Sequence, residues 1–438
     1  MKVYFYTLGC RVNQYETDAA RELFIKAGFE IADSAEDADV CVVNTCTVTG
    51  EADRKSRQQL RRMARINPDT IVVAMGCMTE MAEAVIDADV VCGTKDKTSV
   101  VEKTLEYISR KSGGESLSRG VMHHRPEVTK KDDYHEFGTV LSPEGTRAFI
   151  KVEDGCNKFC TYCIIPFARG RVASRAEDAV LKEAQDLASR GYSEVIVSGI
   201  HVCSYGKDRG EDSLALVRLL KKIDAIEGIS RIRLGSLEPM SLTDDFIEGL
   251  KGVTKLCPHF HLSLQSGCDK ILSKMNRDYT SKEYLERVRK LRAIYPSMSL
   301  TTDIICGFPE ETEEDFKETC DFVIEAGFTK VHTFPYSERE GTVAAKMPQV
   351  PVNVRKDRAS RLIAVSKDLE NNFAAKKVGS AASVLIETFK DGYAEGYTLE
   401  YIRAKVRTED NSLKGKTVSV KAVRAEENTI ICELMANG

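Results

Sequence analysis

The chain of 438 residues lacks any apolar run long enough to span a bilayer, so no membrane-spanning helix is expected. Its first residues, MKVYFYTLGC, form a short strand pattern rather than a signal peptide, and we therefore expect a cytoplasmic protein. An excess of positive charge is also lacking. The net charge is −4, so any binding of RNA must come from a local patch of basic residues. With 42% hydrophobic and 30% charged residues, the chain can form two or three domains.

Cysteine is abundant, and its spacing is the strongest signal in the sequence. Fourteen cysteines in a reducing compartment favour metal ligation or buried thiols over disulfides. Cys156, Cys160 and Cys163 lie in GCNKFCTYC, and no second cysteine pair lies at the distance that a tetrahedral zinc site needs. A [4Fe-4S] cluster held by three cysteines keeps one iron open, where the amino and carboxylate groups of S-adenosylmethionine can bind. This spacing, with Tyr162 before the last cysteine, resembles the radical S-adenosylmethionine (SAM) superfamily.

The first 112 residues alternate between strand-like and helix-like segments, with helices expected at 17–27 and 52–66. The apolar runs lie at Val3–Tyr6, Val40–Val43, Ile71–Met75 and Val90–Val91. This alternation predicts a parallel sheet covered by helices, with its functional edge at the carboxyl ends of the strands. Cys10, Cys46 and Cys77 each follow such a run, so three thiols can converge there on a second cluster. The alternative is that they fill the core. Cys92 also ends a run and remains a further candidate, whereas Cys41 lies inside a run and is interpreted as core.

A basic segment, ADRKSRQQLRRMAR, follows Cys46. On a helix, four of its arginines fall on one face: Arg54, Arg57, Arg61 and Arg65. Such a stripe is usually a solvated surface. Because it lies beside a predicted cluster loop, the alternative is a track for RNA phosphates, and these four arginines are the RNA-binding candidates.

Residues 113–141 interrupt the periodicity and are predicted to be a linker, in which His123 and His124 are exposed. From residue 142 to 373, helices alternate with six strand-like runs: Ala148–Val152, Glu194–Ile200, Arg231–Leu237, His259–Leu264, Ser299–Cys306 and Lys330–Phe334. Three helices begin with a polar cap and an acid three residues later: Ser174 with Glu177, Thr280 with Glu283 and Thr312 with Asp315. Six β/α units are too few to close an eight-stranded barrel. We therefore expect an α/β core of the (β/α)6 partial TIM barrel type, with its site at the carboxyl ends of the strands.

Small and polar residues recur after successive strand-like runs of this segment. Those that could bind SAM are Gly199, Ser236, Glu238, Gln265, Asp303 and Gly307. A single residue of this kind would be weak support for a SAM site, since glycine and serine are common in turns. Their recurrence after successive strands is the stronger argument. Gly199 would let the backbone approach the methionine amino group. His201, His259 and His261 are interpreted as core or loop residues.

Residues 374–438 change in character. Strand-like runs lie at Val384–Phe389, Tyr397–Val406, Thr417–Val423 and Thr429–Leu434, with a hairpin turn at Asp391-Gly392. A small antiparallel β-barrel fits this pattern, of a type that can bind nucleic acids. Tyr393, Tyr397 and Tyr401 could stack on bases or could pack within the fold, and the sequence favours neither alternative.

Motifs along nearly the whole chain resemble the radical SAM methylthiotransferases. These are TLGCRVNQYET, VVNTCTV, GCNKFCTYCIIPFARG, GSLEP, HLSLQSG and TTDIICGFPEET. Within that family, TLGCRVNQYET and GYTLEYIRAKV look most like the bacterial enzyme that modifies N6-threonylcarbamoyladenosine in tRNA. GCMTEM, around Cys77, is a looser match, because the family often has Gln where this chain has Glu80.

The resemblance implies a methylthiotransferase domain at 1–112, a radical SAM core at 142–373 and a TRAM domain at 374–438. It implies two [4Fe-4S] clusters, an auxiliary one on Cys10, Cys46 and Cys77 and a radical one on Cys156, Cys160 and Cys163. One SAM would methylate a sulfur on the auxiliary cluster, and a second would be cleaved to the radical that activates adenine C2 next to the anticodon. The implied partners are the tRNA anticodon stem-loop, an external electron donor and a sulfur donor.

Three kinds of rival remain at this stage. Family members that act on isopentenyladenosine in tRNA, or on a ribosomal protein, share the chemistry and differ in substrate. A non-catalytic iron–sulfur RNA-binding sensor would keep the clusters but would not form 5′-deoxyadenosine under reduction. A zinc-dependent RNA-binding protein would contain zinc and no iron.

Overall fold

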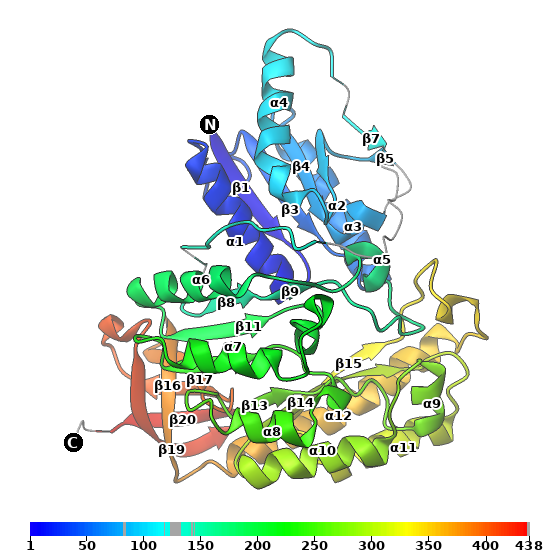
Figure 1. The fold of residues 1–438 in the computed structure, drawn as a ribbon, viewed down its shortest axis with the longest axis vertical. Coiled ribbons are helices and arrows are strands. Elements are labelled where there is room, and N and C mark those ends of the chain that lie inside the picture. The colour runs from blue at the N-terminus through cyan, green and yellow to red at the C-terminus, as the bar shows by residue number, and fades with distance from the viewer. Residues whose placement is uncertain (82–84, 118, 123–132, 142, 144, 436–438) are drawn as a thin grey trace.

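The computed structural model describes residues 1–81, 85–117, 119–122, 133–141, 143 and 145–435. Figure 1 shows three parts: an N-terminal sheet with its helices at the top, a larger core below it, and a C-terminal barrel at the lower left. None of the helices in the described ranges has both the length and the hydrophobic composition that a bilayer span requires. The predicted exposure of His123 and His124 falls outside the described residues.

The N-terminal part is a five-stranded parallel sheet in the order β2-β1-β3-β4-β6. Its strands are β1 (Lys2–Thr7), β2 (Glu30–Ile31), β3 (Val40–Thr45), β4 (Ile71–Gly76) and β6 (Val90–Cys92). Its helices are α1 (Arg11–Lys26), α2 (Gly50–Ile66), α3 (Cys77–Met81), η1 (Lys97–Ser99) and α4 (Val100–Ser112). Every residue of β3 and β4 is buried, as expected of central parallel strands with helices on both faces. A small ribbon of β5 (Val85–Ile86) and β7 (Val121–Met122) flanks the sheet.

The core contains six parallel strands that follow one another in chain order, which confirms the predicted partial barrel. They are β8 (Ala148–Lys151), β11 (Glu194–Ser198), β12 (Arg231–Leu234), β13 (His259–His261), β14 (Ser299–Cys306) and β15 (Lys330–Pro335). The first three pair as one sheet and the last three as another, and a parallel bridge between Leu237 and Leu262 joins the two halves. The covering helices are α6 (Glu177–Ser189), α7 (Ala215–Asp224), α8 (Asp244–Leu250), α9 (Asp269–Lys274), α10 (Ser281–Ile294) and α11 (Glu313–Ala326). Short elements complete it: β9 (Glu153–Asp154), α5 (Ile165–Arg169), β10 (Ala173–Ser174), η2 (Val202–Ser204), η3 (Lys207–Arg209), η4 (Pro239–Ser241) and η5 (Ala344–Lys346).

Two of the three predicted helix caps are confirmed and one is wrong. Thr280 and Thr312 each form a complete capping box with the acid three residues on. Ser174 instead lies in β10, and the N-cap of α6 is Ala176. Asp208 bonds the Ser174 hydroxyl, which is therefore taken up by a loop contact and cannot cap the helix.

The C-terminal part is a closed five-stranded barrel in the order β16-β17-β18-β20-β19. Its elements are β16 (Ala381–Lys390), β17 (Tyr393–Thr398), β18 (Arg403–Arg407), η6 (Asn411–Leu413), β19 (Thr417–Glu426) and β20 (Thr429–Leu434). Asp391 and Gly392 have φ angles of 52° and 77° and form the predicted hairpin turn. The expectation of one strand over 397–406 is wrong, because Tyr401 adopts φ 67° and the chain turns there. The pairing of β18 with β20 is parallel, and the other pairings are antiparallel.

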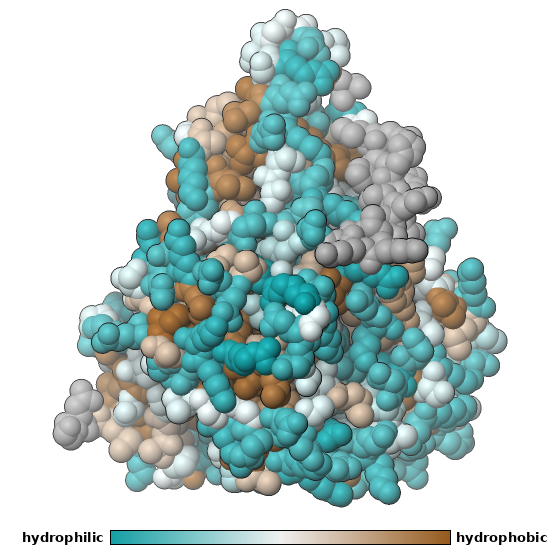
Figure 2. All heavy atoms as spheres, viewed as in Figure 1, coloured by the Kyte–Doolittle hydropathy of each residue, from teal (hydrophilic) through white to brown (hydrophobic). Residues whose placement is uncertain are grey.

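Helix α12 (Val352–Ala375) leads from the core to this barrel and ends beside it. On the face shown in Figure 2, hydrophilic side chains predominate and hydrophobic ones form smaller patches. The largest apolar cluster lies inside the core, between its strands and the helices that cover them. The polar residues described next are therefore held in place by strands and helices that pack on a large apolar core.

Candidate active site

The three N-terminal cysteines lie at the carboxyl ends of adjacent strands. Cys10 follows β1 and precedes α1, Cys46 follows β3, and Cys77 follows β4 as the first residue of α3. Burial raises the pKa of Cys46 and Cys77, and the nearby Cys10 raises both further, as expected for thiols that face one another. Cys41 and Cys92 belong to the apolar clusters on the two faces of the sheet. The structure thus brings Cys10, Cys46 and Cys77 together and places the other two cysteines in the core.

Two glycines and one asparagine allow this approach. Gly9 and Gly76 have φ angles of 111° and 104°, and a Cβ on Gly76 would lie 2.4 Å from the Asn44 amide oxygen. The Asn13 amide donates to the carbonyls of Leu8 (2.8 Å) and Thr45 (3.0 Å), which ties the loops after β1 and β3 to α1. The convergence of the cysteines is therefore built into the backbone.

The second set, Cys156, Cys160 and Cys163, lies in the loop between β9 and α5. Arg277 donates to the Cys160 sulfur (3.5 Å), and the Thr161 hydroxyl donates to the carbonyl of Lys274 (2.8 Å). Burial raises the pKa of Cys156 and Cys163 to about 12, with the neighbouring thiols adding to the effect. Both thiols therefore stay protonated until a metal displaces the proton.

The buried acids beside this loop show that a cationic ligand could bind there. Within the described part of the chain, Glu153 Oε1 and Glu238 Oε1 are buried and have no hydrogen-bond partner. Both carboxylates raise the pKa of Cys156, which places them near that sulfur. Arg277 joins the acids to the cluster loop by donating to Glu238 (2.9 Å) as well as to Cys160. Unpartnered carboxylate oxygens next to three cysteines fit an iron–sulfur cluster and the ammonium and sulfonium groups of SAM.

The six residues predicted to bind SAM divide into two groups. Gly199, Ser236 and Asp303 line a large cavity, and Glu238 lies beside the cysteine loop. Gln265 continues the strand pairing of β13, because its NH donates to the Asp303 carbonyl (2.9 Å). A Cβ on Gly307 would lie 2.9 Å from Arg355 Cα, so this glycine serves the packing of α12. Neither Gln265 nor Gly307 lines the cavity.

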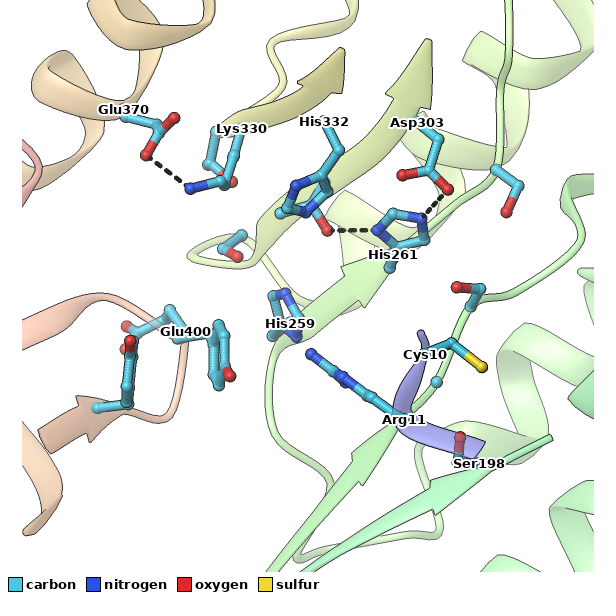
Figure 3. Close-up of a pocket in the computed structure, with 18 of the residues that line it drawn as sticks. Cys10, Arg11, Ser198, His259, His261, Asp303, Lys330, His332, Glu370 and Glu400 are labelled. Carbon is cyan, nitrogen blue, oxygen red and sulfur yellow. Dashed lines mark hydrogen bonds and ion pairs between the residues drawn. The ribbon is translucent and has the colours of Figure 1, made fainter. Parts of the chain in front are cut away.

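The cavity has a volume of about 950 Å³ and is lined by residues from all three parts of the molecule. Figure 3 shows the side chains that surround it. Cys10 and Arg11 come from the start of α1, Ser198 and Ser236 from ends of core strands, and Tyr401 from the C-terminal barrel. A volume of this size suits one modified base together with a cofactor.

The polar inner face of the (β/α)6 core was not identified from the sequence, because His259 and His261 were interpreted as core or loop residues. His259, His261 and Ser263 alternate along and beyond β13, and all three line the cavity. The pattern repeats in Ser299, Thr301 and Asp303, and again in Lys330 and His332. Alternation with period two is the signal that could have found this polar inner face. His261 bonds Thr301 (3.0 Å) and Asp303 (3.3 Å), while burial lowers the pKa of His259 well below its usual range.

The tyrosines of the C-terminal barrel pack at the junction with the core. Tyr397 and Tyr401 stack with ring centroids 4.5 Å apart, and Arg147 donates to the Tyr401 hydroxyl (2.8 Å). Arg233 of β12 donates to the carbonyl of Leu399 (3.0 Å). These contacts favour the packing alternative for Tyr397 and Tyr401, which both line the cavity.

A buried charge network links the two cysteine sets. Arg169, at the end of α5 after Cys163, donates to Asn13 (2.8 Å) and Glu16 (2.8 Å) of α1. The same Asn13 oxygen lies 3.6 Å from the Cys10 sulfur. The short path from Cys10 through Asn13 to Arg169 therefore positions one cysteine loop relative to the other.

The arginine stripe of α2 lies on the surface. Three of its four members pair with neighbouring acids: Arg54 with Glu51 (2.7 Å), Arg57 with Asp53 (3.0 Å) and Arg61 with Asp87 (2.8 Å). Arg65 is exposed in the last turn. Pairing lowers the positive potential that RNA would meet, so the role of this stripe stays a prediction.

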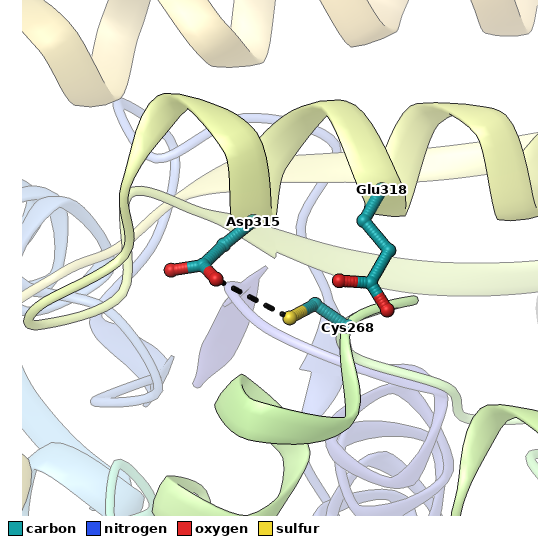
Figure 4. A group of neighbouring side chains, drawn as sticks. All are labelled: Cys268, Asp315 and Glu318. Carbon is teal, nitrogen blue, oxygen red and sulfur yellow. Dashed lines mark hydrogen bonds between the residues drawn. The ribbon is translucent and has the colours of Figure 1, made fainter.

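One further group of possible metal ligands is explained by helix packing. Cys268, Asp315 and Glu318 place one ligand atom each within 4.8 Å of the others, as Figure 4 shows. Asp315 already accepts from the Thr312 NH (2.9 Å) as part of the α11 capping box, and it pairs with Lys270 (2.7 Å). The group therefore stabilises the start of the helix.

Comparison with known proteins gives matches over nearly the whole chain. Residues 150–323 match the radical SAM superfamily, and residues 2–92 match the uncharacterized protein family UPF0004. A Bacillus subtilis protein named threonylcarbamoyladenosine tRNA methylthiotransferase MtaB is 41% identical over 97% of this chain and 94% of its own. An Aquifex aeolicus protein of the same name is 38% identical over 91% of this chain and 97% of its own. A Thermoanaerobacter protein named tRNA-2-methylthio-N(6)-dimethylallyladenosine synthase is 35% identical, over 98% and 92%.

The chain belongs to the radical SAM tRNA methylthiotransferase family. Membership implies a [4Fe-4S] cluster and SAM, which the loop of Cys156, Cys160 and Cys163 and its buried acids fit. Among solved structures, the radical SAM methyltransferase TsrM from Kitasatospora setae superposes with a TM-score of 0.56, covering 78% of this chain and 75% of its own at 17% identity. That likeness supports the fold.

Proposed function

We propose that this protein modifies tRNA by inserting a methylthio group at C2 of N6-threonylcarbamoyladenosine next to the anticodon. The observation that carries the proposal is the cavity shared by all three parts of the molecule. Cys10 of one cysteine set lines it directly, and Ser198 and Gly199 line it on the core side. A base that entered would meet Cys10 of the N-terminal set directly and, on the core side, Ile165, which lies two residues after Cys163.

The proposed cofactors are two [4Fe-4S] clusters and SAM. Cys156, Cys160 and Cys163 would hold one cluster, and Cys10, Cys46 and Cys77 the other. When bound, these groups supply the sulfur, the methyl group and the radical that replacement of an unactivated C2–H bond requires. Support for the second cluster comes from the three converging thiols and from the glycines that let their loops approach.

The side chains of this protein orient the reactants and exclude water. The free oxygens of Glu153 and Glu238 would accept hydrogen bonds from the SAM ammonium group, while Arg277 holds Glu238 and the Cys160 sulfur in place. The target base would leave the anticodon loop stack to enter the cavity, as bases do in enzymes that modify them. Arg169 would maintain the distance between the two cysteine loops.

The tRNA would be bound mainly outside the cavity. The proposed contacts are the C-terminal barrel, as a TRAM domain at 374–438, and the arginines of α2, with an external electron donor and a sulfur donor as further partners. Since tRNA is the substrate, the proposed place of action is the cytoplasm.

Threonylcarbamoyladenosine is favoured by the most similar relatives cited, which are named for that nucleoside. The alternative is N6-isopentenyladenosine, because relatives at 34–36% identity are named for the dimethylallyl nucleoside. The two substituents differ in charge: the first carries a carboxylate and the second is a hydrocarbon. The polar residues on the inner face of the (β/α)6 core suit the charged substituent.

The test is reconstitution with iron and sulfide, followed by reaction with SAM, a reductant and anticodon stem-loops carrying either nucleoside. We expect 5′-deoxyadenosine and methylthio product with the threonylcarbamoyl RNA. Intact SAM would instead support the non-catalytic sensor. Product only on the isopentenyl RNA would show that the substrate is N6-isopentenyladenosine. Iron content separates the cluster proposals: Cys77→Ala should remove about half of the iron, whereas Cys92→Ala, in the apolar core, should remove none.

A further inference from the structure

The charged side chains that line the cavity almost all have a hydrogen-bonding or ion-pairing partner. Asp303 forms a hydrogen bond with His261 (3.3 Å), and Glu370 pairs with Lys330 (3.2 Å). Glu400 pairs with Lys377 (2.6 Å), and Arg403 pairs with Glu395 (2.6 Å). These pairs satisfy the three carboxylates and two of the cations on the cavity wall.

Arg11 is the exception. Its guanidinium forms no ion pair and no hydrogen bond with any residue of the described ranges, and it lies 6.0 Å from the centre of the Tyr401 ring. Arg11 is half-buried in the cavity wall. A half-buried cation on a cavity wall, without a carboxylate partner, suits the binding of an anion.

The direction of Arg11 indicates where that anion lies. Cys10 is the N-cap of α1, with extended backbone angles, and Arg11 is the first residue of the helix. In Figure 3 the Cys10 sulfur points to one side, and the guanidinium extends the opposite way, toward His259. His259 is buried in the same wall, and its Nδ1 has no partner within the described part of the chain. Two unpartnered polar groups therefore converge on the region of the cavity away from the cysteines.

The proposed substrate has its anion in a matching place. C2 and C6 flank N1 on the same ring of adenine, and their outward bonds diverge, so a base with C2 toward Cys10 directs its N6 substituent to a different part of the cavity wall. Threonylcarbamoyl ends in a carboxylate and a hydroxyl, whereas isopentenyl offers neither. The RNA phosphates would stay outside when the base enters, and Glu153 and Glu238, each with one unpartnered oxygen in the described structure, mark the SAM site on the other side.

We propose that Arg11 binds the carboxylate of the threonylcarbamoyl group and thereby selects this nucleoside over adenosines with an apolar N6 substituent. His259 supplies a neutral hydrogen-bonding group for the hydroxyl or the urea of the same substituent. This inference rests on the proposed function and adds the residue that determines its specificity.

The test compares three anticodon stem-loops of one sequence, whose target adenosine carries threonylcarbamoyl, its neutral methyl ester, or isopentenyl. Binding to the reconstituted holoenzyme is measured by fluorescence anisotropy without SAM, and product by mass spectrometry. The wild type should prefer the acid to the ester by about 10- to 100-fold, the value of a charged hydrogen bond in a desolvated site. Arg11→Gln should bring this ratio toward one, and Arg11→Lys should retain part of it.

Arg403→Gln is the matched control, because it removes a cation from the same cavity that already has a carboxylate partner. It should keep the wild-type ratio of acid to ester. Because the ratio compares two ligands within one variant, partial loss of iron lowers both affinities and leaves the ratio readable.

Three results would overturn the inference. They are an unchanged ratio in Arg11→Gln, an equal loss of affinity for all three RNAs, and a wild type that does not distinguish acid from ester. An equal loss with a weaker salt dependence would assign Arg11 to an RNA phosphate. Product on the isopentenyl RNA alone would refute the proposed substrate itself, whereas product on the threonylcarbamoyl RNA with an unchanged ratio would refute only the role of Arg11.

Discussion

Replacing Glu16 tests the buried junction between the N-terminal sheet and the core. Its carboxylate accepts from Lys97 (2.5 Å), Lys151 (2.8 Å) and Arg169 (2.8 Å), and Asp154 is the second anion of the network. Three cations and two anions are thus buried together. Glu16→Gln leaves three cations facing one carboxylate, whereas Arg169→Gln leaves two cations and two carboxylates.

The expected magnitudes follow from this imbalance. Removing one partner from a buried ion pair costs about 3–5 kcal/mol, and Glu16→Gln should lower the free energy of unfolding by that amount. Arg169→Gln should cost roughly 1–3 kcal/mol, because the remaining charges balance and the main loss is of hydrogen bonds. Urea unfolding of anaerobically purified protein, followed by circular dichroism, measures both values.

The pH dependence gives a second readout. Burial raises the pKa of Glu16, but Arg169, Lys151 and Lys97 together lower it well below its ordinary value of 4.5. Stability from a lowered pKa is present above the unfolded value and is lost as the pH falls toward the folded one. The difference between wild type and Glu16→Gln should therefore be largest above about pH 5 and shrink in acid. A variant as stable as the wild type, or less damaged than Arg169→Gln, would refute this reasoning.

Two other predictions concern the N-terminal part. Gly76→Ala should lower the melting temperature more than Gly28→Ala, because both have positive φ but only Gly76 has neighbours where the new Cβ would lie; equal shifts would show that the crowding is relieved. Replacing Arg57 and Arg61 together with Glu should weaken RNA binding and reduce its dependence on salt concentration. Unchanged binding would show that this face of α2 is a solvated surface.

Much of the fold could be predicted, because apolar runs bounded by caps and turns are local signals. The limits of β14 and β20 coincide with the predicted runs Ser299–Cys306 and Thr429–Leu434. The break between β17 and β18 could not be predicted, because it depends on a positive φ at Tyr401 inside a run with strong strand propensity. The prediction that Ser174 caps a helix was wrong for a related reason. Its sequence context suits a cap, but its hydroxyl donates a hydrogen bond to Asp208, which is distant along the chain.

The candidate site was predictable where spacing along the chain carried the information. Cys156, Cys160 and Cys163 form a compact motif of that kind. Arg11 carries no such signal, because what singles it out is the absence of a partner once the other charges of the cavity are paired. That pairing joins residues from distant parts of the chain, and only the three-dimensional arrangement reveals it.

The central claim is tested most directly by mass analysis of tRNA nucleosides from cells lacking this gene. The cells would carry no plasmid, an intact copy or a Cys160→Ala copy. We predict 2-methylthio-N6-threonylcarbamoyladenosine only with the intact copy. A methylthio group on isopentenyladenosine would contradict the substrate assignment, and unchanged nucleosides with every copy would contradict the proposed reaction.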